Sequence, residues 1–538
     1  MTEPSPQPDG RRRSARTPLL AAALAASALA LAALAWQGAF PWNLAAQAPS
    51  SEPPDTRPAS GPPAADAEGA GAAPSGREVP GVADGTGNGM AAGDDAEAPA
   101  SDGGAPAVGE AEPPEAGAEG AVQGGGPGDG AARGPGFTLS VLESMARGRA
   151  LHPFREPSSG FREAAARLDE SDWRGISYRE PARLWAGEDT AFEVSFFHAG
   201  FIYDRPVRIH SVEGGMTREI AFDASAFDYP DGAGAWKDAV PGFAGFTVHY
   251  PMNQAGRMDD AVVFLGANHF RAAARHSRFG ETARAVILDP AEPDGEEFPY
   301  FSEFWLMRPE PGDQEMTVYA LLESRRLVGA MRIVIRPGSS MSMQTTLTLY
   351  RRSGEKWPER LGLAPVSGMY LYSEKENGSP YDWRPELHGT DGLVYTDGEG
   401  GWFLRALNNP RRLMTTGFPG HQAGGGWGLI QRDNDFDHYQ DVGRRYDLRT
   451  WVWAEPGPGF PPGSLELIEI PNSQEIHDNI IAYWSVDPAA LAGDSLACSY
   501  SLFWMPPASN PHNLGRVVSA RLLSRTSRDF VEFYLDFD

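Results

Sequence analysis

Three neighbouring apolar runs decide the fold of this chain: Met316-Thr-Val-Tyr-Ala-Leu321, Met331-Arg-Ile-Val-Ile335 and the stretch from Met343 to Tyr350. Each is short, rich in β-branched or aromatic residues, and bounded by Gly, Pro, Asp or Asn, which is typical of β-strands. Similar runs occur at Phe192–Phe196, Leu465–Ile470 and Leu496–Trp504. Because long helical patterns between the runs are missing, the sequence predicts a mainly β protein built as a large antiparallel β-sandwich.

Helical patterns are confined to the region before the first strand. Ser140-Val-Leu-Glu143 has the capping-box pattern, so a short helix is expected to begin there. A second helix is expected around residues 161–168. Function in such a fold is expected to lie in the long polar loops.

Composition divides the 538 residues into five segments. We expect a cytoplasmic basic segment at 1–16, a transmembrane anchor or signal segment at 17–37, a disordered acidic linker at 49–135, the β-sandwich domain at 136–515 and a terminal remnant at 516–538. The linker is almost entirely Ala, Gly, Pro, Ser, Asp and Glu, which cannot bury enough apolar surface to offset the entropy of ordering.

The N-terminal pattern predicts export across a membrane. Arg11, Arg12, Arg13 and Arg16 precede an apolar run that is long for a cleaved signal, and Pro49 follows the small-residue pattern Ala46-Gln-Ala48, so we favour an uncleaved anchor. The positive residues place that end in the cytoplasm and the folded domain outside it. The membrane is therefore expected to contact the N-terminal segment only.

Charge and cysteine content exclude several classes of function. A net charge of -26 argues against nucleic acid as a partner, because binding phosphates needs clustered Lys and Arg. Cys498 is the single cysteine, so no intramolecular disulfide can form. The histidines lack ligand spacing, and His438 stands where a calcium loop beginning at Asp433 would need Gly. We therefore expect neither a metal nor a cofactor.

Acids, amides and rings are dense between Asp391 and Asp478. Rings stack on sugar faces, and paired carboxylates can hydrolyse glycosidic bonds, so this stretch suits a carbohydrate site. From the residues alone, a carbohydrate enzyme, a sugar-binding module and a structural role all stay open. Trp402, Trp427 and Trp451 could stack on sugars, but burial in the core is the favoured interpretation for most tryptophans here.

Several strings together resemble the periplasmic glucan biosynthesis proteins G and D. The strings keep the family's order over about residues 136–537, and they include Phe196-Phe-His-Ala-Gly200, Gly242-Phe-Ala-Gly-Phe246, Ile335-Arg-Pro-Gly338, Arg384-Pro-Glu386, Leu407-Asn-Asn-Pro410, Gln431-Arg-Asp433 and Phe436-Asp-His-Tyr-Gln440. The resemblance implies a sandwich of the galactose-mutarotase-like type with a long cleft for a β-1,2-linked glucose polymer. It also implies a periplasmic location and, in some members, hydrolysis with inversion.

The same resemblance assigns roles to individual residues. Asp478, in the pattern Glu-x-x-Asp-Asn-Ile, matches the general acid, and Asp391 matches the base in a His-Asp-Ser-Asp-Gly-Leu string. Gly389 replaces the first aspartate of that string. Substrate contacts are predicted at six further residues: Tyr446, Glu475, Arg384, His388, Asp437 and His438.

Relatives continue into an immunoglobulin-like domain, which we expect to be missing here, leaving the strand near 529–537 to pair with the main domain or to fray.

Two functions remain open: hydrolysis of a β-1,2-glucan, or binding of the nascent glucan to assist its export or branching beside a membrane glucan synthase.

Overall fold

The computed structural model describes residues 136–156, 158–230, 233–292, 295–376, 378, 382–418, 425–512, 515, 517–524 and 532–537. The segments predicted at 1–16, 17–37 and 49–135 lie outside these described residues. Within the described residues, no helix combines the length and apolar composition needed to cross a bilayer.

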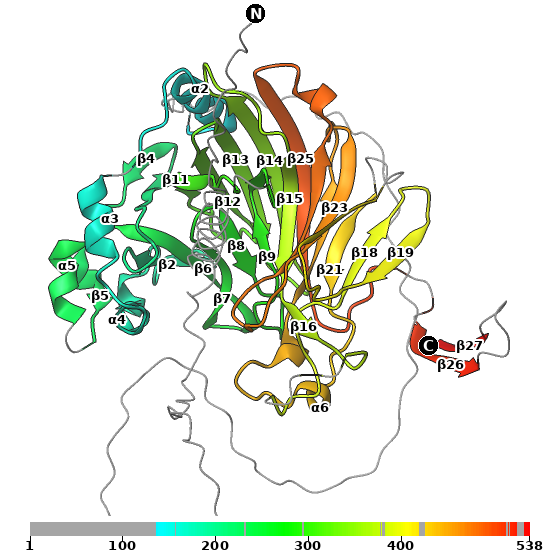
Figure 1. Ribbon diagram of the computed structural model, residues 1–538. Helices are drawn as coiled ribbons and strands as arrows, with labels where there is room; N and C mark the ends of the chain where they lie inside the picture. The colour runs from blue at the N-terminus through cyan, green and yellow to red at the C-terminus, as the bar shows by residue number, and fades with distance from the viewer. Residues whose placement is uncertain are drawn as a thin grey trace, which may run out of the picture. The chain divides into compact units, whose positions relative to one another are not determined.

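Two large sheets form the protein, as predicted (Figure 1). In spatial order, the first sheet contains β2 (Glu193–His198), β6 (Phe243–Gln254), β7 (Arg257–Leu265), β8 (His269–Ala272), β9 (Thr282–Arg284), β15 (Leu361–Gly368), β24 (Ile480–Val486), β23 (Gly463–Glu469) and β20 (Met414–Phe418), with β10 (Val286–Leu288) also paired to β15. All pairings in this sheet are antiparallel.

The second sheet contains the three apolar runs at 316–321, 331–335 and 343–350. Its spatial order is β19 (Trp402–Ala406), β18 (Gly392–Thr396), β21 (Trp427–Ile430), β22 (Trp451–Pro456), β25 (Ser495–Met505), β14 (Met341–Arg351), β13 (Leu327–Arg336), β12 (Met316–Glu323), β11 (Tyr300–Met307), β3 (Arg208–Glu213) and β4 (Met216–Glu219). The strand predictions at 316–321, 331–335 and 343–350 are thus confirmed as β12, β13 and β14. The pairing of β11 with β3 is parallel.

The core lies between the two sheets, because each contributes one buried face to a common apolar cluster. Phe246 of the first sheet meets Phe304 of the second edge to face, with ring centroids 4.9 Å apart. Phe270 and Trp504 make a similar contact across the layers at 5.9 Å. Burial of these aromatic faces is what fixes the sandwich.

The helices are α2 (Leu139–Ala150), α3 (Ser159–Ala165), α4 (Glu170–Gly175), α5 (Trp236–Ala239) and α6 (Phe436–Tyr439). Both predicted helices exist, but α2 begins earlier than its capping-box pattern indicates. The side chain of Thr138, rather than Ser140, accepts the hydrogen bond from the Val141 backbone and caps the helix. Leu142 and Ala146 of α2 pack on the outer face of the second sheet, against Trp305.

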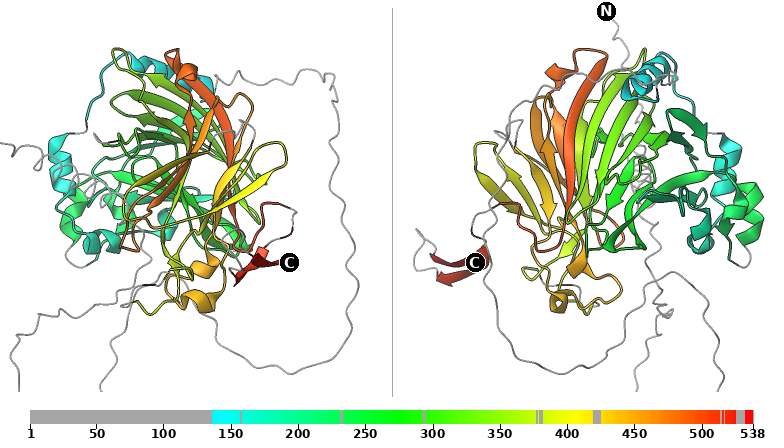
Figure 2. Two further views of the ribbon diagram at one scale, coloured as in Figure 1. Left: turned by 45° about the vertical axis from the view of Figure 1, so that its right-hand side comes forward. Right: turned by 180° about the vertical axis from the view of Figure 1, so that it is seen from behind.

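Small pairs of strands complete the fold: β1 (Ser177–Tyr178) with β5 (Phe227–Asp228), β16 (Tyr370–Tyr372) with β17 (Leu387–His388), and β26 (Val517–Ser524) with β27 (Glu532–Phe537). The expectation for the terminal strand was therefore wrong, because β27 pairs with β26 instead of joining the main domain or fraying. Figures 1 and 2 show β16 and α6 together at one end of the two large sheets.

Candidate functional site

The loop between β23 and β24 carries both Glu475 and Asp478, and amide side chains fix it in place. Asn479 at its end pairs with the backbone of Tyr370: Oδ1 accepts from the Tyr370 nitrogen at 2.8 Å, and Nδ2 donates to the Tyr370 oxygen at 2.9 Å. Asn472 donates to the carbonyl oxygens of Gln474 and His477. The loop is thereby held against β16.

Asp478 is held by three strands of the first sheet. Its Oδ2 accepts hydrogen bonds from Thr282 Oγ1 at 3.1 Å, Ser367 Oγ at 3.3 Å and the Arg271 guanidinium at 3.4 Å. These donors lie on the adjacent strands β9, β15 and β8. The side chain keeps 16% of its surface exposed, so this carboxylate is oriented by the sheet and still reachable by a ligand.

Glu475 is the centre of a charged cluster with two other predicted residues. Tyr446 donates its hydroxyl to Oε1 at 2.6 Å, and Arg384 donates to Oε2 at 3.0 Å. Burial alone would raise the pKa of Glu475, but the bonds from Arg384 and Tyr446 and the charge of Arg444 outweigh burial and lower it. The charged form of the Glu475 carboxylate is thereby favoured, and it lies among several hydrogen-bond donors, an arrangement that suits the binding of sugar hydroxyls.

Asp391 lies close to the same corner of the fold but has its own partner. The backbone nitrogen of Gly389 donates to the Met369 oxygen at 2.8 Å, so the 389–391 segment abuts the junction between β15 and β16 that also anchors the Asp478 loop. The Asp391 carboxylate itself is buried and pairs with the Arg432 guanidinium at 2.8 Å. The structure thus brings the two loops to one junction while giving their carboxylates different partners.

Two predicted contact residues, Asp437 and His438, lie on the exposed surface of α6. His438 Nδ1 contacts Asp433 Oδ2 at 2.5 Å, and this hydrogen bond raises the pKa of the His438 imidazole. His388 is fully buried, bonds Glu386 at 2.7 Å and lies against Tyr439. Because His388 is buried, a ligand at the surface could be affected by it only through the residues that it contacts, such as Glu386 and Tyr439.

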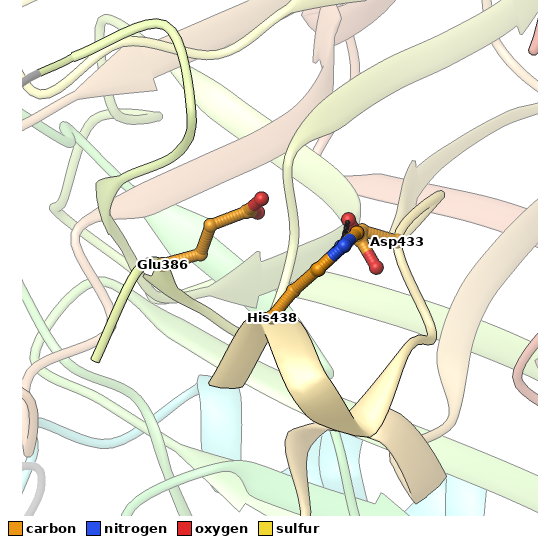
Figure 3. A group of neighbouring side chains, drawn as sticks. All are labelled: Glu386, Asp433 and His438. Atoms are coloured by element: carbon orange, nitrogen blue, oxygen red, sulfur yellow. Dashed lines mark hydrogen bonds and ion pairs between the residues drawn. The ribbon is translucent and has the colours of Figure 1, made fainter. Parts of the chain in front are cut away.

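The part of the chain that the structure describes contains one group able to hold a metal ion (Figure 3). Glu386, Asp433 and His438 point toward one another, and one ligand atom from each lies within 4.8 Å of the others. Two carboxylates and an imidazole would suit a divalent cation. Sequence spacing did not predict this group, because Glu386 is far from α6 along the chain.

Several residues at the site were not predicted. Arg271, Thr282 and Ser367 orient Asp478, although Arg271 is separated from it by 207 residues and belongs to no motif. Arg449 lies over the ring of Tyr446, with its guanidinium carbon 3.9 Å from the centroid. Arg271, Thr282 and Ser367 come together through sheet pairing, so spacing along the sequence could not reveal them.

Burial in the core, the interpretation favoured for most of the tryptophans, is confirmed for Trp427 and Trp451. Trp427 and Trp451 are fully buried, and Trp402 stacks on Trp453 with ring centroids 5.3 Å apart.

Comparison with known proteins gives one consistent result. Residues 137–538 match the family model described as "Periplasmic glucan biosynthesis protein, MdoG". The chain is 37% identical over 386 residues to glucans biosynthesis protein G of Ralstonia nicotianae, covering 72% of this chain and 76% of the relative. It is 38% identical over 425 residues to glucans biosynthesis protein D 1 of the same organism, covering 74% and 78%.

Similarity to solved structures is weak. The GH36 alpha-galactosidase AgaB of Geobacillus stearothermophilus matches 48% of this chain and 38% of its own, with 8% identity and a TM-score of 0.25, so no argument rests on it.

Proposed function

The chain belongs to the family of periplasmic glucan biosynthesis proteins, MdoG, and on that premise we propose that it binds and hydrolyses the β-1,2-linked glucose backbone of a periplasmic glucan. The observation that carries the proposal is the anchored loop between β23 and β24. It presents Asp478, oriented by three strands, beside the charged cluster of Glu475, Arg384 and Tyr446.

In this proposal, Asp478 is the general acid and Asp391 the base. The glycosidic oxygen takes a proton from Asp478 as its bond to the anomeric carbon breaks, and a water molecule bonds to that carbon from the opposite face. Asp391 takes the proton that the water releases, which inverts the anomeric configuration. The ion pair with Arg432 supports this role, because it fixes the position of the carboxylate.

Substrate contacts are proposed at six residues. Glu475, Arg384 and Tyr446 would bind hydroxyl groups directly, and the exposed Asp437 and His438 would extend the surface along α6. The buried His388 would act by holding Glu386.

A second function, binding without hydrolysis, is favoured by Gly389. Relatives that the chain resembles have an aspartate at this position, and its loss removes one carboxylate from the junction. A protein that retained the hydroxyl-binding cluster alone would hold the nascent glucan beside a membrane synthase. In both cases we propose a periplasmic location, with residues 17–37 as the tether.

Product analysis separates the two functions. The full-length chain would be incubated with linear β-1,2-glucan, and the length of the products would be followed by chromatography. We expect shortening by the wild type and a loss of at least about a hundredfold in Asp478→Asn, since a positioned general acid contributes about 10²–10⁴-fold.

The matched control is Asp228→Asn, which removes an exposed carboxylate on β5 that pairs with Arg179. This variant should hydrolyse normally. If the wild type binds the glucan but leaves it intact, the binding function replaces the hydrolase; if Asp478→Asn shortens the glucan at the wild-type rate, Asp478 is not the acid.

A further inference from the structure

Three arginines lie together behind the predicted site. Arg278 and Arg449 are neighbours through a parallel β-bridge, in which the Arg278 oxygen accepts from the Thr450 nitrogen at 3.0 Å. Arg445 lies close enough for its charge to act on Arg278. Burial lowers the pKa of Arg278, and the charges of Arg445 and Arg449 lower this pKa further. The charge of Asp447 acts in the opposite direction. In a chain with a net charge of -26, this is a local excess of positive charge.

The nearby acids leave Arg449 without a full counter-charge. Asp447 forms an ion pair with Arg445 at 2.6 Å. Arg449 itself makes no side-chain hydrogen bond or ion pair with any residue that the structure describes, and its guanidinium lies on the Tyr446 ring. Such a cation–π contact orients a guanidinium without neutralising it.

One acid on which the charge of Arg449 acts is Glu281, which is deeply buried. Neither of its carboxyl oxygens has a hydrogen-bond partner among the described residues, and a charged carboxylate in that position would be strongly unfavourable. Burial, together with the charge of Asp478, raises the pKa of Glu281 well above its usual value, although Arg449 and Arg271 act in the opposite direction. A buried carboxyl whose pKa is raised in this way is a poor counter-charge for Arg449.

The residue that faces the Arg449 guanidinium at position 389 is a glycine, which has no side chain. A Cβ atom added to Gly389 would have only two neighbours within 4 Å, an Arg449 guanidinium nitrogen at 3.6 Å and the Met369 oxygen at 3.9 Å. Both are ordinary contact distances. A side chain at position 389 would thus face the Arg449 guanidinium, and glycine places none there.

We propose that Arg449, with Arg278 and Arg445 beside it, binds a small oxyanion, a carboxylate or a phosphate group, on the side of its guanidinium that faces Gly389. The planar guanidinium suits such groups because it donates two parallel hydrogen bonds. The anion has two sources, a free anion in the periplasm or an acidic substituent on the glucan. Only the second source rests on the proposed function.

Anion titration of the full-length chain tests the site itself. Acetate and inorganic phosphate would each be added at constant ionic strength with chloride as the balancing salt, and binding followed by calorimetry and by the melting temperature. We expect a saturable rise in melting temperature for the wild type, because a ligand that binds only the folded state stabilises it. The response should be lost in Arg449→Gln and in Gly389→Asp, whose own carboxylate would face the Arg449 guanidinium.

Arg336→Gln is the matched control, since Arg336 pairs with Glu315 on the exposed surface at the end of β13. It should keep the wild-type response. An unchanged saturable response in either Arg449→Gln or Gly389→Asp, with both variants folded by circular dichroism, would overturn the proposal, and so would a wild type that does not respond.

A second arm distinguishes the two sources. Neutral β-1,2-glucan and the same glucan carrying carboxymethyl groups would be bound to wild type and Arg449→Gln. A substituent site predicts at least about tenfold tighter binding of the charged glucan, lost in Arg449→Gln; a free-anion site predicts instead that acetate tightens binding of the neutral glucan. If the wild type does not hydrolyse the glucan, the proposed hydrolase function is contradicted but the anion site is not, because the anion titration does not depend on turnover.

Discussion

At the residue scale, Glu281 makes a prediction about pH. Its carboxyl is buried without a partner, so the folded protein keeps a proton that the unfolded chain releases above about pH 4.5. The folded state then binds more protons, and its free energy of unfolding falls as pH rises, by up to about 1.4 kcal/mol per pH unit for one group. Glu281→Gln cannot titrate, so the free energy of unfolding of the wild type, taken relative to that of the variant, should fall as pH rises above 5, measured by urea unfolding.

The control for that series is Glu170→Gln, at an exposed carboxylate in the first turn of α4. Its stability relative to the wild type should change less with pH than that of Glu281→Gln, because the Glu170 side chain is exposed. A constant difference for Glu281→Gln would show that Glu281 is ionised in the folded state, and Arg449 would then have a counter-charge.

Some residues of the candidate site could be predicted from the sequence, and others could not. Glu475, Tyr446 and Arg384 could be named because they stand in strings that resemble a known family, and the structure places them in one cluster. Glu281 and Arg449 stand in no such string, and what distinguishes them is the absence of a partner. A missing partner is a property of three-dimensional neighbours, so it cannot be derived from spacing.

At the scale of elements, strands were easier to predict than their partners. Period-two patterns gave β12, β13 and β14, which are consecutive and pair as hairpins. The sequence could not indicate that β3 pairs in parallel with β11, or that Ser367 on β15 lies beside Thr282 on β9, because these contacts join strands distant along the chain. The candidate site depends on such pairings between strands that are distant along the chain.

One such contact gives a prediction for Gly280, just before β9. Its backbone approaches the segment before β22 so closely that an added Cβ would lie 1.8 Å from the Thr450 oxygen. Because the obstacle is backbone, Gly280→Ala must displace one segment, and we expect a loss of at least about 2 kcal/mol in the free energy of unfolding. Denaturant unfolding of Gly280→Ala, beside Gly417→Ala, measures this.

Gly417 in β20 is the matched control, since a Cβ there would meet nothing within 4 Å. We expect its stability to change by no more than about 0.5 kcal/mol. Equal stability of the two variants would mean that the segments before β9 and β22 separate without cost, and the Arg278–Arg449 pair would then not be fixed.

At the scale of the whole molecule, the sandwich and the β26–β27 hairpin differ in what they bury. The sandwich core joins apolar residues from both large sheets. The hairpin strands pair only with each other among the described residues, and Phe533, Tyr534, Leu535 and Phe537 are exposed. A two-stranded hairpin of this kind is marginally stable by itself, so the stability of the molecule resides in the sandwich.

Truncation tests this division. A chain that ends at Gly515 lacks the hairpin but keeps β25, the strand that joins β14 to β22 in the second sheet. Because little apolar surface is removed from the core, we expect its melting temperature to stay within about 2 °C of the full-length value. A chain that ends at Asp494 loses β25 and should show no cooperative unfolding transition by calorimetry. A marked loss of stability in the chain ending at Gly515 would show instead that the hairpin packs on the sandwich.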